Sequence, residues 1–150
     1  MVRRRMPLVV LLAVLAVAAL VYFIFFADTS GTSGKVAYNV RINEVMTSNK
    51  GSVASPIGTY PDWIELQNTS GERINLTGYG LSDDKLSPAK WAFPAGTHIE
   101  PNGYLVVWCS GDAAEGSLFA GFKLAATDDL VLLDPSGRPV DSLALTSVPS

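Results

Sequence analysis

Apolar residues follow two different patterns along this chain. Leu8 to Ala27 are twenty consecutive residues without a charge, Pro, Gly, Ser or Asn. After residue 35, no stretch sustains apolar residues at helical spacing over three turns, and short alternating or apolar runs are separated by turn residues. The pattern predicts one helix followed by a region of β-strands.

The first apolar stretch has the length of a membrane span. Twenty residues of helix rise about 30 Å, the hydrocarbon thickness of a bilayer. Arg3–Arg5 precede the stretch, and the positive-inside rule keeps such residues in the cytoplasm. We therefore expect an uncleaved signal anchor over residues 1–27. It crosses the cell membrane once, at residues 8–27, and leaves the rest of the chain outside the cell.

Two alternatives remain for this segment. A cleaved signal peptide has a shorter apolar region, roughly 7–15 residues, that ends at a small-x-small site. Here bulky Phe25 occupies the −3 position of a cut after Ala27. A buried core helix is the other alternative. Residues 28–37 contain many small polar residues, which predicts a flexible Gly/Ser linker between the anchor and a domain at 38–150.

The pattern after the linker predicts roughly eight strands in one domain. Glu100–Gly103 and Asp134–Gly137 carry the Pro and Gly of tight turns, and the second turn joins the last two strands as a hairpin. Many short strands indicate an all-β fold, an immunoglobulin-like β-sandwich without its disulfide. Asn43–Tyr60 is a long polar insertion that we expect to be the most mobile loop. The expected strands are Val36–Val45, Asp62–Gln67, Ile74–Leu76, Tyr79–Ser82, Trp91–Phe93, Tyr104–Cys109, Leu130–Leu133 and Val140–Leu145.

Composition and charge exclude several classes of function. The chain is 48% apolar, but 23 of the first 27 residues are apolar against 49 of the other 123, an ordinary fraction for a soluble domain. After residue 27, 8 Lys and Arg stand against 14 Asp and Glu, a net charge of −6. Nucleic-acid-binding domains usually have a basic patch, so we expect no nucleic-acid partner. One Cys and one His exclude an intrachain disulfide and a four-ligand zinc site.

Three tryptophans are the first candidate binding residues. A sugar-binding platform on the sandwich surface is one interpretation of Trp63, Trp91 and Trp108. Each lies in an expected strand, and aromatic side chains dominate sandwich cores. We therefore expect all three in the core.

Acidic pairs, the histidine and the cysteine are further candidates. Asp83–Asp84 and Asp128–Asp129 suggest a calcium site, but neither fits the D-x-[DN]-x-[DN]-G spacing, and Asp is common in turns. His98 lies beside a turn, and the chain has no G-x-S-x-G element, so we expect a solvated histidine. Cys109 ends an apolar strand, and we expect a small buried side chain, with a reactive outside thiol as the alternative.

Carboxylate pairs are the last candidates. Glu65 with Asp62, or Glu44 with Glu65, would suit a glycosidase if a cleft held them apart, but solvent-facing or strand-end carboxylates are the commoner explanation. The glycosylation sequons at Asn68 and Asn75 matter only in a eukaryotic secretory pathway. We therefore assign no catalytic, cofactor-binding or metal-binding residue, and we expect neither an enzyme nor a cofactor.

Seven segments of the part after the linker follow one another in a recognisable order. They are Ile42–Met46 (INEVM), Asp62–Asn68 (DWIELQN), Ile74–Asp84 (INLTGYGLSDD), Lys90–Thr97 (KWAFPAGT), Gly103–Trp108 (GYLVVW), Phe122–Leu124 (FKL) and Leu133–Gly137 (LDPSG). Together they span about residues 40–145 and resemble the lamin tail domain family, in the form found on exported bacterial proteins. No single segment is decisive, and the resemblance rests on their order.

The resemblance implies an immunoglobulin-like β-sandwich that acts as a binding or scaffolding module and not as an enzyme. In bacterial relatives the domain is often fused to other exported modules, including spore-coat kinase-like domains and nucleases. Lamin tails bind proteins and DNA in the nucleus, but the acidic charge here gives no reason to expect DNA binding. The expected partners are the lipid bilayer, through residues 8–27, and an unknown protein or cell-envelope polymer.

The family pattern normally continues past the last expected strand into a segment that closes the sandwich, whereas this sequence ends at Ser150. Either the closing strand is dispensable, or the 150 residues are the front of a longer protein. We favour the second alternative, because a missing strand leaves an unpaired edge. An alternative function follows from it: the chain is the N-terminal targeting and binding part of an exported enzyme whose catalytic domain lies beyond Ser150.

Overall fold

The computed structural model describes residues 38–87 and 89–147, all within the compact unit Tyr38–Ser150. The predicted membrane anchor at residues 8–27 and the linker at 28–37 lie outside the described residues. Within the described ranges, no helix is long and apolar enough to cross a membrane.

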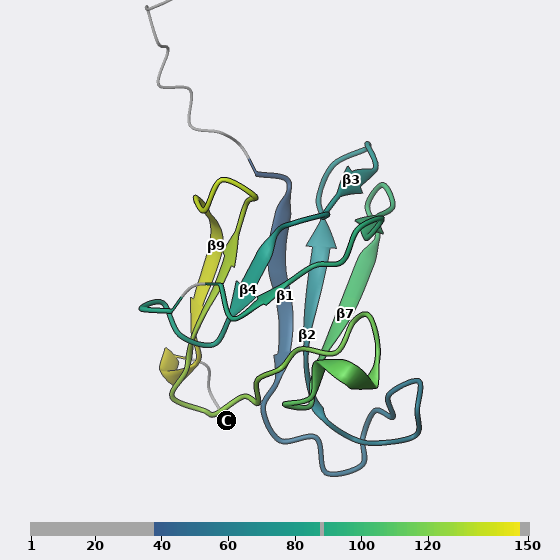
Figure 1. Cartoon of the computed structure of the whole chain (residues 1–150), viewed down its shortest axis with the longest axis vertical. Coiled ribbons are helices and arrows are strands. Elements are labelled where there is room, and N and C mark those ends of the chain that lie inside the picture. Colours follow the sequence, from purple (N-terminus) through teal and green to yellow (C-terminus); the bar gives the residue numbers. More distant parts are fainter. Residues whose placement is uncertain (1–37, 88, 148–150) are drawn as a thin grey trace, which may run out of the picture. The chain divides into compact units, whose positions relative to one another are not determined.

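The regular structure of the described part consists mainly of strands in antiparallel sheets, joined by turns and loops (Figure 1). The elements are β1 (Val40–Met46), β2 (Asp62–Asn68), β3 (Ile74–Asn75), β4 (Gly80–Ser82), β5 (Trp91–Ala92), β6 (His98–Ile99), β7 (Tyr104–Cys109), β8 (Asp129–Leu133) and β9 (Pro139–Ala144), with 3₁₀ helices η2 (Ala113–Glu115) and η3 (Leu145–Ser147). A three-stranded sheet has the order β1-β2-β7, a four-stranded sheet the order β5-β4-β8-β9, and a two-stranded ribbon pairs β3 with β6. The predicted all-β class is confirmed, and these sheets are consistent with an immunoglobulin-like sandwich.

Alternating side chains of the two larger sheets meet in one core. Ile64 and Leu66 of β2 have no exposed surface, and Leu130 and Leu132 of β8 have at most 1%. Burying such a side chain contributes about 1.5–3 kcal/mol relative to leaving it exposed, so this core holds the sheets together. The other buried members are Val40, Leu76, Leu81, Trp91, Phe93, Ile99, Val107, Cys109, Ala120, Phe122, Leu124 and Leu145.

The predicted hairpin between the last two strands is confirmed, and Asp134 fixes its turn. Its carboxylate accepts hydrogen bonds from the Ser136 hydroxyl at 2.6 Å, the Arg138 amide at 3.0 Å and the Tyr38 hydroxyl at 3.0 Å. These hydrogen bonds, led by that of Ser136, hold the pKa of Asp134 well below its ordinary value. Tyr38 thereby ties the start of the domain to this turn.

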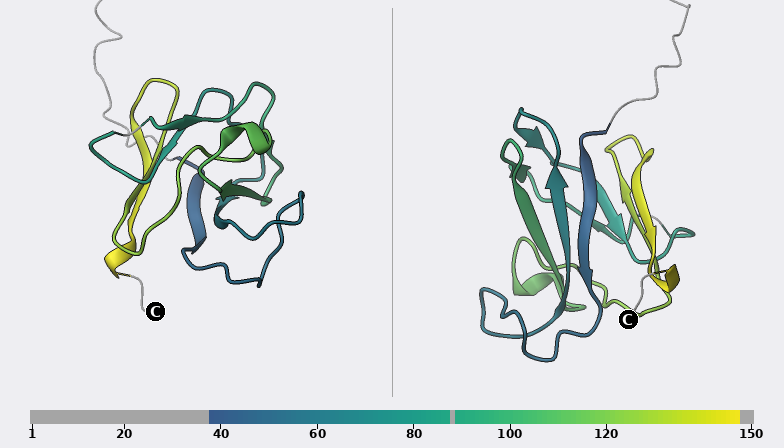
Figure 2. Two further views of the ribbon diagram at one scale, coloured as in Figure 1. Left: turned by 60° about the horizontal axis from the view of Figure 1, so that its bottom comes forward. Right: turned by 180° about the vertical axis from the view of Figure 1, so that it is seen from behind.

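The loop that follows β1 is shorter than the sequence predicts. β1 begins at Val40 and continues to Met46, so the first four residues of the predicted loop Asn43–Tyr60 belong to a strand. The loop itself is Thr47–Pro61, which joins β1 to β2 at the end of the sandwich opposite the start of β1 (Figure 2). The sequence pattern assigns Asn43–Val45 both to the expected strand Val36–Val45 and to this loop, and the structure places these residues in the strand.

A β-bulge explains the mixed pattern in β1. The register shifts between Ile42 and Glu44, which leaves Asn43 as the extra residue. An extra residue reverses the faces that later side chains occupy. Val45 therefore packs on the core, and Met46 packs on the opposite face of the sheet.

β6 (His98–Ile99) is a strand that the sequence analysis misses. Ile99 pairs with Ile74 and His98 with Asn75, and Ile99 is 1% exposed in the core. A two-residue strand between two turns is too short to produce an alternating pattern. The described residues therefore contain nine strands rather than the expected eight.

The two larger sheets adjoin at β1 and β9, where a side chain connects them. The Asp141 Oδ2 atom of β9 accepts a hydrogen bond from the backbone amide of Ile42 in β1 at 2.8 Å. Its Oδ1 atom accepts one from the Ser142 amide at 2.9 Å. The Asp141 carboxylate thus hydrogen-bonds to a backbone N–H group on the edge of β1 that faces away from β2. It connects β1 and β9, which belong to different sheets.

Candidate functional site

The loop Thr47–Pro61 is organised around one buried side chain, Asn49, which is 8% exposed. The side-chain oxygen of Asn49 accepts hydrogen bonds from two backbone amides of the loop, and its side-chain nitrogen donates to two backbone carbonyl oxygens. Its own backbone amide donates to the Asp62 carboxylate at 3.0 Å. The side-chain oxygen, the side-chain nitrogen and the backbone amide of Asn49 therefore hold the loop in one conformation. The side-chain bonds are Ser52 N to Oδ1 (3.1 Å), Val53 N to Oδ1 (3.2 Å), Nδ2 to Val53 O (2.6 Å) and Nδ2 to Pro61 O (2.9 Å).

A second turn shapes the tip of the loop. The Ser55 amide donates to the Thr59 carbonyl at 2.7 Å, and the two hydroxyls of these residues hydrogen-bond at 2.8 Å. Apolar side chains project from this frame: Val53 is 41% exposed, Ile57 50% and Tyr60 50%. They are three of the five large hydrophobic side chains that are exposed in the described part of the chain. The hydrogen bonds fix the backbone that carries these side chains, which makes the loop a candidate contact surface.

A polar pocket of about 380 Å³ lies beside the end of this loop. Asp62 at its wall is engaged by the Asn49 amide, and Cys109 is 1% exposed. Burial raises the pKa of the Cys109 thiol far above its usual value, so this sulfur is a neutral thiol and not a nucleophile. The prediction of a small buried Cys109 is confirmed. Besides Asp62, the charged residues that line the pocket are Glu115 and Lys123, and they are the ones that could contact a polar ligand.

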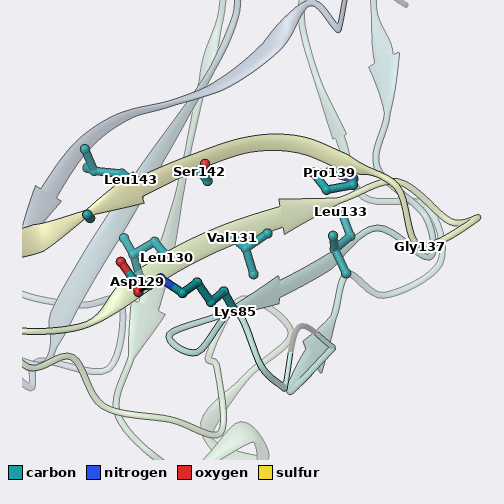
Figure 3. A pocket seen from close by; sticks show the side chains of 10 residues that line it. Lys85, Asp129, Leu130, Val131, Leu133, Gly137, Pro139, Ser142 and Leu143 are labelled. Carbon is teal, nitrogen blue, oxygen red and sulfur yellow. Dashed lines mark ion pairs between the residues drawn. The ribbon is translucent and has the colours of Figure 1, made fainter.

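A groove of about 390 Å³ lies along the β8–β9 hairpin (Figure 3). Val131, Leu133 and Pro139 line it with apolar surface, and the Lys85 Nζ atom lies 2.6 Å from the Asp129 Oδ2 atom at one end. The hydrogen bond to Asp129 raises the pKa of Lys85. Because the Lys85 side chain is 67% exposed, this ion pair contributes little to stability. The groove is short and apolar, and the charges of Lys85 and Asp129 at one end neutralise each other.

The tryptophans are buried and form no exposed platform. Trp91 lies in the core as predicted, at 9% exposure. Trp63 and Trp108 are 7% and 8% exposed, but they face each other across β2 and β7 on the side away from the core. Phe119 covers them, with its ring centroid 6.5 Å from that of Trp108. The expected place in the core is confirmed for all three, with Trp63 and Trp108 in a second, smaller core cluster on the other face of the β1–β2–β7 sheet.

Antiparallel pairing of β4 with β8 brings the two acidic pairs to the same end of the sheet. Their carboxylates have other partners, and the described residues hold no group of three or more His, Cys, Asp or Glu that could bind a metal ion. The calcium interpretation therefore gains no support. The contacts are Asp83 with Lys90 Nζ (2.7 Å), Asp129 with Lys85 Nζ (2.6 Å), Asp84 Oδ1 with Leu86 N (2.8 Å) and Asp128 Oδ2 with Ala125 N (2.7 Å).

His98 lies in β6 and not in a turn, and its ring belongs to a surface cluster. The ring nitrogen Nδ1 lies 2.9 Å from the Gly96 carbonyl and donates to it. Nε2 faces the Arg73 guanidinium and lies 3.2 Å from Glu100 Oε1. The ring is 37% exposed, so the solvated turn histidine of the sequence analysis is a half-exposed strand residue with ionic partners.

The carboxylates Glu44 and Glu65 are opposite each other in the β1–β2 ladder. Glu65 Oε1 accepts from the Asn43 side-chain amide at 2.8 Å, while Asp62 is engaged at the end of the strand by the Asn49 amide. The first two carboxylates project from an open sheet face rather than across a cleft. This arrangement does not favour a glycosidase pair.

Asn68 of the first sequon is a structural residue that the sequence analysis misses. Its side chain has no exposed surface and closes the end of β2 against the chain around β3 and β6. A polar residue at a strand end carries no sequence signal of burial, so only its contacts reveal this role. They are Nδ2 to the carbonyl oxygens of Glu72 (2.6 Å), Glu100 (3.0 Å) and Ile99 (3.3 Å), and Oδ1 from the Ser70 amide and hydroxyl (both 2.8 Å).

Comparison with known proteins agrees with this fold. The Lamin Tail Domain family matches residues 34–147, which include every strand described above. No curated protein matches the chain. The family comprises immunoglobulin-like binding domains and is not a known catalytic one. With the match spanning most of its length, the chain belongs to the lamin tail domain family.

Proposed function

We propose that the chain is a single-pass membrane protein that displays its lamin tail domain outside the cell as a non-catalytic binding module. The apolar stretch at residues 8–27, with Arg3–Arg5 before it, supports the anchor and its orientation. Family membership supports binding rather than catalysis. The partner that we propose is a protein.

One observation carries the assignment of the contact surface. The loop Thr47–Pro61 holds Val53, Ile57 and Tyr60 exposed on a hydrogen-bonded frame centred on Asn49. A loop that is already in its bound shape loses little conformational entropy on binding, so its apolar side chains contribute more of their burial energy to affinity.

The position of the loop also suits a tethered module. β1 starts close to Tyr38 and leads directly into the loop at the other end of the sandwich (Figure 2). Its seven residues span about 20 Å at 3.3 Å per residue. A domain held through its N-terminal end therefore presents this loop at the far end.

Site-specific photo-crosslinking in intact cells tests the proposal. A photoreactive residue at Ile57 is expected to give one crosslinked product, and the same product is expected from Tyr60. Leu86 is the matched control, because it is an 88% exposed apolar residue on a different loop. Equal crosslinking from Ile57 and Leu86, or none from either loop position, would contradict the proposed surface. Protection of the domain from protease added outside the cells would contradict the proposed orientation.

A further inference from the structure

The outer face of the β1–β2–β7 sheet, on the side away from the core, is covered along only part of its length. At the end near the loop, Phe119 lies over Trp63 and Trp108. A parallel backbone bridge between Trp108 and Phe119 fixes this cover. Towards the start of β7, the same face is open, and Tyr104 projects from it with 55% exposure.

Three planar side chains form one hydrogen-bonded row across this open part. Arg41, Gln67 and Tyr104 are neighbours in the registers of the three strands. The Arg41 Nε atom donates to the Gln67 side-chain oxygen, and the Gln67 amide nitrogen donates to the Tyr104 hydroxyl, both at 2.9 Å. The hydrogen bond from the neighbouring strand tethers the Tyr104 hydroxyl, while the side chain stays 55% exposed.

A second row of polar groups lies beside the first. Glu65 of β2 is paired with Glu44 of β1 and Val106 of β7, and it accepts from the Asn43 amide at 2.8 Å. These groups keep hydrogen-bonding capacity beyond the contacts already made: a guanidinium has five N–H donors, a carboxylate has two acceptor oxygens, and the Tyr104 hydroxyl still has its own proton to donate. The open part therefore combines a fixed aromatic ring with donors and acceptors of both kinds.

We propose that this open face binds a neutral, flat polysaccharide chain of β-1,4-linked pyranose units. The apolar face of one sugar ring stacks on Tyr104, while Arg41, Asn43 and Glu65 hydrogen-bond to the hydroxyls of the neighbouring units. A ribbon-shaped glycan can contact both rows at once, since their side chains lie on the same face of the sheet. The site is separate from the proposed protein-binding loop and does not depend on it.

Charge argues for a neutral sugar and against a phosphate polymer. Glu44 and Glu65 bring two carboxylates to this face, and the chain after residue 27 has a net charge of −6. Both repel anionic ligands. A protein partner would need a desolvated apolar centre, whereas the open part holds polar side chains around one ring and Val106.

Binding of cellohexaose and chitohexaose to the full chain in lipid nanodiscs, measured by calorimetry, tests the proposal. We expect saturable binding of at least one hexasaccharide and a loss of affinity of about tenfold or more in Tyr104→Ala, because the stacked ring is lost. Tyr104→Phe retains the ring, so it is expected to bind within a few-fold of the wild type. Leu86→Ala is the control, because Leu86 is an exposed residue that lies outside both proposed binding surfaces.

Three outcomes would overturn the proposal. The first is no saturable binding of either hexasaccharide by the wild type. The second is an equal loss of binding in Leu86→Ala and Tyr104→Ala. The third is a protein that crosslinks from position 104 and is not displaced by either sugar, which would make the face a protein interface. Unchanged thermal unfolding of Tyr104→Ala, followed by tryptophan fluorescence, establishes that its loss of binding is not a loss of fold.

Discussion

Replacing Asn68 by aspartate exchanges a single heavy atom of a fully buried side chain and removes the donors that it presents. In the wild type, the two N–H groups of Nδ2 serve the carbonyl oxygens of Glu72, Glu100 and Ile99. A carboxylate oxygen in the same place faces these oxygens without a proton between them. The bonds that Asn68 Oδ1 accepts from Ser70 survive the exchange.

The expected cost follows from these contacts. Two lost hydrogen bonds contribute about 1 kcal/mol each, and the unpaired buried carboxylate adds roughly 1–3 kcal/mol, so Asn68→Asp is expected to lower the free energy of unfolding by about 3–5 kcal/mol at neutral pH. Burial and the facing carbonyl oxygens raise the pKa of the new carboxyl group in the folded state above its unfolded value. The loss is therefore smallest in acid and grows as pH rises through the folded-state pKa.

Urea unfolding of the full chain in detergent micelles, followed by tryptophan fluorescence, measures this effect. All three tryptophans lie within the sandwich, so the signal reports on this domain alone. Asn75→Asp is the control, because Asn75 is exposed and uses only its Oδ1 atom, towards the Thr77 amide and hydroxyl, which a carboxylate can replace. We expect the control to stay within about 0.5 kcal/mol of the wild type. An Asn68→Asp variant as stable as this control, or one that gains stability as pH rises, would refute the reasoning.

Three further predictions concern other groups. The depressed pKa of Asp134 stabilises the fold above the unfolded value and loses this effect as pH falls; the wild-type melting temperature should thus drop below about pH 4, and Asp134→Asn, less stable at neutral pH, should show a flatter profile. Cys109 should resist iodoacetamide in the native state and react fully in urea, because burial raises its thiol pKa; rapid native labelling, detected by mass spectrometry, would contradict this. Asn49→Ala should speed tryptic cleavage after Lys50 by about tenfold through local opening of the loop, and cleavage at the wild-type rate would show that Asn49 does not fix the loop.

Strand positions could be predicted from this sequence because most strands bury one face on the core. The alternation of Ile64 and Leu66 with polar neighbours, and the turn chemistry around Asp134, correspond to real elements with bounds within about two residues. Features that interrupt the two-residue alternation of buried and exposed side chains in a strand could not be predicted. The extra residue at Asn43 changes faces within a strand without any change in composition.

The candidate binding surfaces were harder to predict than the strands. The sequence predicts Trp63 and Trp108 in the core but not in which of the two core clusters, because a sheet face that a non-strand segment covers is as apolar as one that faces another sheet. Asn49 and Asn68 stabilise the structure through hydrogen bonds to residues distant in sequence, which the local sequence pattern does not show. Tyr104 was part of an expected strand, but its exposure depends on where the Phe119 segment ends.

The direct path from Tyr38 through β1 to the loop Thr47–Pro61 also has a mechanical consequence. If a bound partner pulls on the loop while the membrane holds the N-terminal end, the tension runs along the covalent backbone of one strand. β1 is already extended, so it has little slack, and the main reserve of length is the bulge at Asn43, about 3 Å for one residue. Within the domain this path is therefore stiff, in contrast to the flexible linker expected at residues 28–37, and force between the two ends of β1 is transmitted without shearing the two large sheets apart.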